Sequence, residues 1–149
     1  MKRLLPILLA ACIASATAAP AFLVTEQEMV ESNAAPPPFT ARSVSAPVKD
    51  APRIEVASPN LSGPLASPTP IQLNFEAAAP AAVKPETFRV LYGAFGIDIT
   101  QRLLGAAKLN AQGISVQEAS LPSGKHKLQL SVEDSLGRKG VRVLEFQIN

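Results

Sequence analysis

The chain has 149 residues and a mass of 15.6 kDa, which is enough for one domain of ordinary size. One Cys and one His exclude a disulfide framework and a zinc cluster built within a single chain. Fourteen Pro, eight Gly and no Trp favour a small β-rich or partly disordered protein over a helical bundle. The formal net charge of +2 is a property of the whole chain, so its meaning depends on how the N-terminus is processed.

The N-terminus has the three-part layout of a secretory signal peptide. Lys2 and Arg3 precede an apolar run over residues 4–13, and small residues follow. The run is shorter than the roughly 20 apolar residues that a transmembrane helix needs. The sequence therefore predicts a signal peptide over residues 1–18, cleaved after Ala18 or as late as Ala21. Its removal takes away both basic residues and leaves a formally neutral exported chain, periplasmic or secreted.

A lipid anchor is the alternative interpretation of the same segment. Leu9-Ala10-Ala11-Cys12 has the residue order of a bacterial lipobox, in which the Cys is acylated and becomes the N-terminus. Few residues separate Arg3 from Cys12, and Pro6 interrupts them, so the cleaved form is favoured over a membrane-anchored lipoprotein. No thiol remains free in either form, and the exported domain must be stabilised by its hydrophobic core.

Prolines divide the rest of the chain into a tail and a domain. Twelve of the fourteen lie between Pro20 and Pro85. Because proline fixes φ and removes a donor, residues 19–51 are expected to form a disordered Pro/Ala-rich spacer that sets distance. Residues 22–30 are the exception, since they have the pattern of a marginal helical turn or two.

From Pro52 onward, short apolar alternations separated by turn residues predict an all-β domain over residues 52–149. The expected strands cover residues 53–57, 70–76, 87–92, 113–117, 125–134 and 140–148. In the last strand the apolar parity changes between Val143 and Leu144, which predicts a β-bulge there. Asp98 or Thr100 precedes good helix formers and Gly105, which predicts one short helical turn.

The stretch Leu121–Arg138 carries a resemblance to a known family. Its turn glycine, aromatic residue, alternating strand, Asp and Gly resemble the penultimate strand of bacterial immunoglobulin-like (Big-type) domains. The resemblance extends over residues 51–149 and implies an immunoglobulin-like antiparallel β-sandwich of about seven strands. His126 stands where family members commonly have a corner tyrosine. The resemblance therefore implies that a ring nitrogen of His126 bonds a backbone carbonyl at that corner.

Catalytic and cofactor chemistry are not indicated. His126 lies on the apolar parity of its strand, so a structural corner is favoured over a catalytic base. Asp134 is expected to accept backbone N–H groups of the turn that contains Gly137, rather than to bind calcium. No metal ion or cofactor is expected, and nucleic-acid binding is disfavoured because carboxylates interleave with the basic residues and no aromatic row accompanies them.

A non-enzymatic binding role is therefore expected, with an unidentified protein or cell-envelope component as partner and a monomeric chain. The alternatives are an accessory chaperone, an inhibitor, or an assembly subunit that exchanges strands. The candidate contact surface consists of two aromatic residues near the third expected strand and five basic residues around the last hairpin: Tyr92, Phe95, Lys125, Lys127, Arg138, Lys139 and Arg142.

Overall fold

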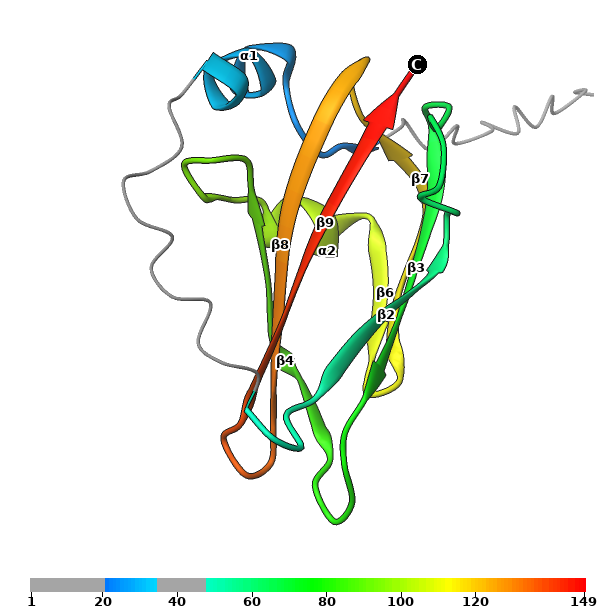
Figure 1. The fold of residues 1–149 in the computed structure, drawn as a ribbon. Helices are drawn as coiled ribbons and strands as arrows, with labels where there is room; N and C mark the ends of the chain where they lie inside the picture. Colours follow the sequence, from blue (N-terminus) through cyan, green and yellow to red (C-terminus); the bar gives the residue numbers. More distant parts are fainter. Residues whose placement is uncertain (1–20, 35–47) are drawn as a thin grey trace, which may run out of the picture.

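The computed structural model describes residues 21–34 and 48–149, which form a β-sandwich with two short helices (Figure 1). The elements in chain order are β1 (Ala21–Phe22), α1 (Glu26–Ala34), β2 (Arg53–Ser58), β3 (Thr69–Glu76), β4 (Val83–Tyr92), β5 (Ile97–Asp98), α2 (Thr100–Gly105), β6 (Ala107–Asn110), β7 (Gly113–Ser120), β8 (Gly124–Asp134) and β9 (Lys139–Ile148). No helix in these two ranges has the length and apolar character needed to cross a membrane. The expected signal peptide, including Cys12, lies outside the described residues.

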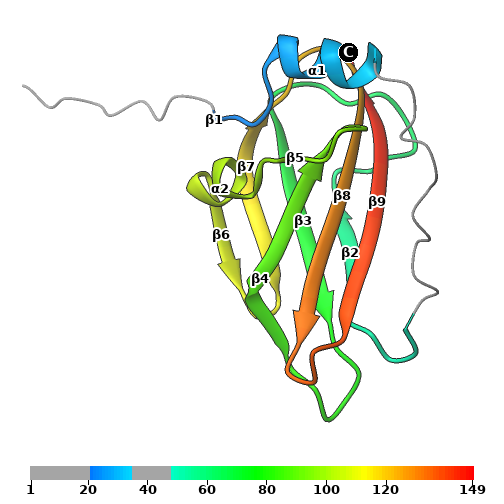
Figure 2. The same ribbon diagram turned by 90° about the vertical axis from the view of Figure 1, so that its left-hand side faces the viewer.

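The strands form two facing sheets, which lie one in front of the other in Figure 2, with β4, β8 and β9 nearer the viewer. One sheet has the order β1-β7-β3-β2, with β6 also pairing with β7, and the other has the order β5-β4-β8-β9. All pairs are antiparallel except β1 with β7. The expected immunoglobulin-like, all-β sandwich is thus confirmed as an architecture.

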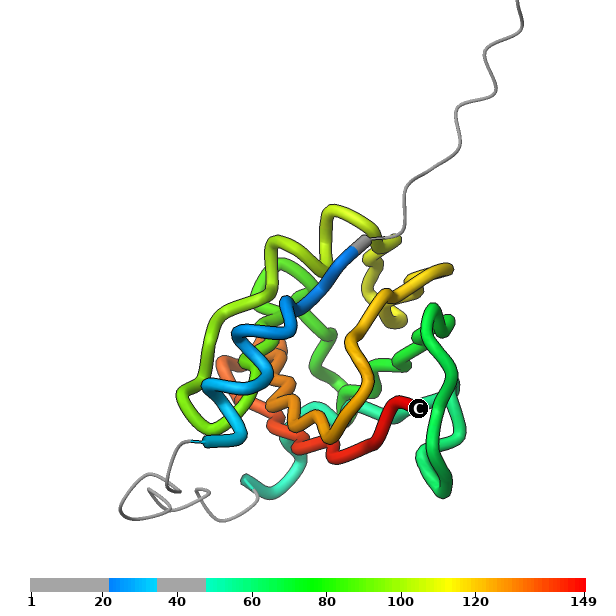
Figure 3. The backbone as a smooth tube through the Cα atoms, turned by 90° about the horizontal axis from the view of Figure 1, so that it is seen from above, coloured from blue at the N-terminus to red at the C-terminus, as the bar shows by residue number. Residues whose placement is uncertain are grey.

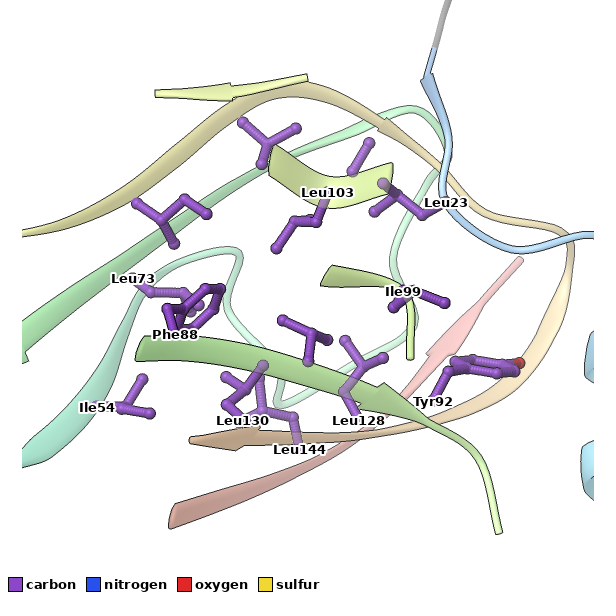
Figure 4. Packing of buried hydrophobic residues seen from close by; sticks show 14 of the residues in the cluster. Leu23, Ile54, Leu73, Phe88, Tyr92, Ile99, Leu103, Leu128, Leu130 and Leu144 are labelled. Carbon is purple, nitrogen blue, oxygen red and sulfur yellow. The ribbon is translucent and has the colours of Figure 1, made fainter. Parts of the chain in front are cut away.

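Alternation along the strands explains why the two layers pack. In β3, Leu73 and Phe75 are buried, whereas Asn74 between them is exposed. In β8, every second residue from His126 to Val132 is buried, namely His126, Leu128, Leu130 and Val132. Figure 4 shows how side chains from both sheets meet between the layers. Burying such side chains removes apolar surface from water, at about 25 cal/mol per Å².

The last strand is regular, so the bulge predicted near Val143 and Leu144 is wrong. β9 pairs with β8 without a register shift from Lys139 to Ile148. Val141 and Val143 face outward, and the inward position between them is occupied by Arg142, whose guanidinium donates to the carbonyl of Ile54 at 3.0 Å. The apolar parity misled the prediction because solvent-facing valines are common in edge strands.

Strands β6 and β4 differ from the sequence interpretation. β6 was not predicted, although it pairs with β7 through four residues. β4 begins at Val83, before the start of the strand expected over residues 87–92, and its register with β8 shifts between Lys84 and Arg89. The predicted short helix is present as α2, where Asp98 accepts the N–H of Thr100 at 2.9 Å.

Residues 21–34 differ from the expected spacer because they pack on the sandwich. β1 pairs with the end of β7, and Leu23 and Val24 are each only 1% exposed within the core. α1 then lies across one end of the sandwich, beside the loop after β4 and the start of β8 (Figure 3). The folded unit therefore includes a segment that precedes the expected domain boundary at residue 52.

Candidate functional site

The end of the sandwich under α1 has a buried corner built on His126. Its Nδ1 lies 2.9 Å from the hydroxyl of Tyr92, and its Nε2 lies 2.8 Å from the carbonyl oxygen of Pro122. Because a carbonyl only accepts, Nε2 carries the proton and Nδ1 accepts the hydrogen of the Tyr92 hydroxyl. The ring of Phe146 stacks on the imidazole at a centroid distance of 5.5 Å. His126 is therefore held between two strands and a loop.

Both titratable groups of this corner are neutral at neutral pH. Burial lowers the pKa of His126, and the hydrogen bond to Pro122 opposes the shift only in part. Burial raises the pKa of Tyr92 to about 12, and the negative charge of Glu28 adds to this. The same burial, with 1% of Tyr92 and 3% of His126 exposed, removes Tyr92 from the candidate contact surface. The corner is a structural unit without an accessible acid or base.

A groove of about 460 Å³ lies beside this corner. Three separated segments form its walls: α1, the loop before β3, and the adjacent ends of β8 and β9. The lining residues are Asn33, Leu61, Ser62, Gly63, Pro64, Lys125, His126, Lys127, Glu145, Phe146 and Gln147. The volume lies within the range of about 300–1,000 Å³ that is usual for small-molecule sites.

The groove carries both charge signs, with an excess of positive charge. Lys127 Nζ lies 3.0 Å from Glu145 Oε1, and both side chains are more than half exposed. Lys125 lies two residues before Lys127 on the same face of β8. Lys125 is exposed as well, so Lys125, Lys127 and Glu145 are all accessible to a ligand. An exposed ion pair such as that of Lys127 with Glu145 contributes little stability.

The loop that forms the outer wall is attached to β9 by backbone hydrogen bonds. The N–H of Leu65 donates to the carbonyl of Gln147 at 2.8 Å, and the N–H of Asn149 donates to the carbonyl of Leu65 at 2.9 Å. Between β2 and Leu65 the loop contains Gly63, and no atom lies within 4 Å of the position that a Cβ would take there. The loop is therefore attached to β9 at Leu65 and has free space around Gly63.

Helix α1, the third wall, is fixed by its own first turn and by contacts at both ends. Thr25 and Glu28 form a capping box: the Thr25 hydroxyl accepts the N–H of Glu28, and the Glu28 carboxylate accepts the N–H of Thr25 at 2.9 Å. The same carboxylate binds Arg102 Nη1 of α2 at 2.7 Å. Hydrogen bonds from Arg102 and Thr25 together lower the pKa of Glu28 to about 2, despite some burial.

The other end of α1 contacts the neighbouring strands. Ser32 Oγ accepts the N–H of Ala94 at 2.9 Å, and Asn33 Nδ2 donates to the carbonyl of Lys125 at 3.4 Å. Gly93 has φ of 69° and packs so closely on Ser32 that a Cβ would overlap the hydroxyl. These contacts hold Asn33 at the rim of the groove.

The remaining residues of the predicted contact surface lie in separate parts of the structure. Phe95 is 68% exposed in the turn between β4 and β5, where it does not line the groove. Arg138 and Lys139 lie at the opposite end of β8 and β9, and Arg142 is bonded to β2. Only Lys125 and Lys127 belong to the groove, so the basic residues do not form one patch.

Asp134 lies in the hairpin between β8 and β9, far along the strands from the groove. Its carboxylate accepts the N–H groups of Leu136 and Arg138, each at 2.9 Å, and Nε of Arg138 at 2.7 Å. Burial alone would raise the pKa of Asp134, but these donors outweigh it and hold that pKa below its ordinary value. Gly137, with φ of 74°, completes the turn. This arrangement holds the turn together around a fully buried carboxylate.

Sequence reasoning missed several groove residues. Asn33 falls within the expected spacer, and residues 61–64 fall between the strands expected over residues 53–57 and 70–76. In residues 21–34 and 48–149 no three His, Cys, Asp or Glu side chains are close enough together to hold a metal ion. The helical turn expected within residues 22–30 overlaps the first half of α1, and the Thr25–Glu28 spacing is a second sequence signal of this helix, which carries Asn33.

No protein-family model matches the sequence, and no curated protein matches it. Among solved structures, the sandwich is similar to that of CopC from Methylosinus trichosporium OB3b, with 15% sequence identity and a TM-score of 0.43. The alignment covers 65% of this chain and 94% of that one. The likeness concerns the β-sandwich alone and extends to no residue role.

Proposed function

We propose that this protein is a non-enzymatic, immunoglobulin-like binding module of the bacterial cell envelope, related to the Big-type domains, that holds its ligand in the groove beside His126. The observation that supports this most directly is the groove itself, with a volume of about 460 Å³ and a mixed lining from three chain segments. A groove of this volume is within the range of small-molecule sites, and its lining combines the apolar side chains of Leu61 and Phe146 with polar and charged groups.

The chemistry around the groove favours binding over catalysis. The only His in the chain is 3% exposed, and both its ring nitrogens are already hydrogen-bonded. Glu145 is the one carboxylate among the described lining residues, and Lys127 neutralises it. A general acid–base mechanism needs a group that can exchange a proton with the substrate, and the buried imidazole with both nitrogens hydrogen-bonded is not free to do so.

Export is part of the proposal and rests on the N-terminal sequence, with cleavage after Ala18 favoured over acylation of Cys12. A start at residue 19 leaves β1 complete, whereas cleavage after Ala21 removes a residue that pairs with Ala119. The folded domain thus supports the earlier of the two cleavage positions. The intact mass of the protein recovered from fractionated cells tests this directly.

Site-directed photocrosslinking in intact cells tests the binding role. A benzophenone amino acid at Ser62 in the groove is compared with one at Lys108, which is exposed on β6 of the other sheet. We expect a light-dependent adduct of defined mass at Ser62 that is lost when Lys125 and Lys127 are replaced by Gln, and no adduct at Lys108. Adducts of equal yield at both positions, or none at Ser62, contradict the proposal.

A further inference from the structure

The groove adjoins a second, apolar space inside the sandwich. This void has a volume of about 30 Å³ and is lined only by apolar side chains of the core and of the loop that forms the groove wall. Leu61 and Phe146 line both spaces. These two side chains therefore stand between the groove and the void, and neither of them is fully buried.

The inner space is suited to hydrocarbon. Its surroundings include Val56, Pro59, Leu65 and Leu144, without a polar atom on the exposed lining. An apolar void of this kind does not offer water the two to four polar partners that it needs, and such voids bind small apolar groups. At about 30 Å³ it accepts only the end of a chain, so the remainder of an apolar ligand lies along Leu61 and Phe146 in the groove.

The outer space is suited to one negative charge. Lys125 and Lys127 contribute two positive charges and Glu145 one negative charge, which leaves an excess of +1 among the ionised groups that line the groove. A monoanion neutralises this excess, whereas a dianionic phosphate exceeds it. The ring of His126 is a neutral wall, because Nε2–H is bonded to Pro122 and Nδ1 to Tyr92.

We infer that the groove binds a single-chain amphiphile with a carboxylate head, such as a fatty acid. The carboxylate lies between Lys125 and Lys127, and the acyl chain passes Leu61 and Phe146 with its end directed into the apolar void. This inference rests on the proposed function, since it names the ligand class for the same groove. The apolar chain supplies binding free energy by removal of its surface from water, at about 0.8 kcal/mol per buried methylene.

Isothermal titration calorimetry of the purified protein with dodecanoate, below its critical micelle concentration and at pH 7.5, tests the inference. We expect saturable binding with one site, and no heat from acetate, which has the head without the chain. Dodecyl maltoside, which has the chain without the charge, is expected to bind at least about tenfold more weakly, a difference of about 1.4 kcal/mol. Dodecyl phosphate, with a chain of matched length, is expected to bind no better than dodecanoate.

Two variants and a matched control locate the site. K125Q/K127Q removes both positive charges and is expected to weaken dodecanoate binding about tenfold or more. L61D places a carboxylate at the junction of groove and void and is expected to abolish binding, with an unchanged circular dichroism spectrum. K108Q/K139Q removes two exposed lysines elsewhere and is expected to leave the affinity unchanged.

The outcomes separate the inference from the proposed function. Dodecanoate binding that is equal in the wild type, K125Q/K127Q and L61D overturns the inference, because the amphiphile then binds elsewhere. If dodecanoate does not bind while the Ser62 crosslink persists, the ligand class is wrong and the groove remains a binding site. If both are absent, the inference and the proposed function fail together.

Discussion

The hydroxyl of Tyr92 and Nδ1 of His126 form a buried hydrogen bond of 2.9 Å between residues 34 positions apart. The bond joins β4 to β8 at the end of the core, where Tyr92 closes the cluster of side chains seen in Figure 4. Because His126 also bonds Pro122 and stacks on Phe146, one side chain ties β4, β8, β9 and the loop before β8 together. His126 and Phe146 also line the groove, so the corner forms part of the groove wall.

Replacement of Tyr92 by Phe is expected to lower the free energy of unfolding by about 1–3 kcal/mol, because it leaves Nδ1 of His126 buried without a donor. A double-mutant cycle with His126→Leu, measured by urea denaturation, isolates the pair. We expect a coupling energy of about 0.5–3 kcal/mol. Strictly additive single-variant effects contradict a direct interaction between the two side chains.

The pH dependence of stability carries the signature of His126. Its pKa in the folded protein is lowered by burial, so between its ordinary value of 6.5 and the lower folded value the unfolded chain binds more protons. The stabilisation is complete above about pH 6.5 and is lost as the pH falls through that range. Since His126 is the only His, its imidazole signals in a proton NMR titration are unique. A midpoint at or above 6.5 contradicts the buried, neutral ring.

The ion pair between Glu28 and Arg102 makes a smaller contribution. Glu28→Gln is expected to destabilise by about 0.5–1 kcal/mol, since Arg102 is 46% exposed and solvent screens the pair. Because the folded pKa of Glu28 is about 2 and its ordinary value is 4.5, this stabilisation is present above pH 4.5 and disappears as the pH falls towards 2. Glu26→Gln, in the same helical turn but outside the capping box, is the control. Equal losses in the two variants exclude a specific role for the pair.

The sandwich was predictable because alternation in β3 and β8 directly reports which residues are buried. Val141 and Val143 were misassigned because apolar character alone does not distinguish an inward from an outward position on an edge strand. A helical turn was expected within residues 22–30, but its length and its packing on the sandwich were not, because α1 has no apolar stripe and depends on tertiary contacts, such as those of Ser32 and Asn33. The groove combines three segments that are distant in sequence, which no local pattern reveals.

The regular register of β9 predicts opposite responses at adjacent positions. Val143→Lys is expected to change stability by less than about 0.5 kcal/mol, because the side chain is 44% exposed. Leu144→Lys is expected to cost more than about 3 kcal/mol or prevent folding, since it places a charge in the core, where Leu144 is 7% exposed. Thermal denaturation of the two variants distinguishes the regular strand from a bulged one, in which both positions face inward and both substitutions are severe.

Two adjacent residues of the N-terminal segment, Phe22 and Leu23, test whether this segment packs as part of the domain. Leu23 is 1% exposed and Phe22, its neighbour, is 70% exposed. If β1 and the residues after it pack as part of the domain, Leu23→Ala costs about 2–5 kcal/mol through lost burial and the cavity that remains. Phe22→Ala then changes the stability by less than about 0.5 kcal/mol. Urea denaturation midpoints measure both, with the slope of the unfolding transition as a check that the folded state is the same. Equal and small effects would show that residues 21–24 are separate from the core, in which case α1 is not a wall of the groove.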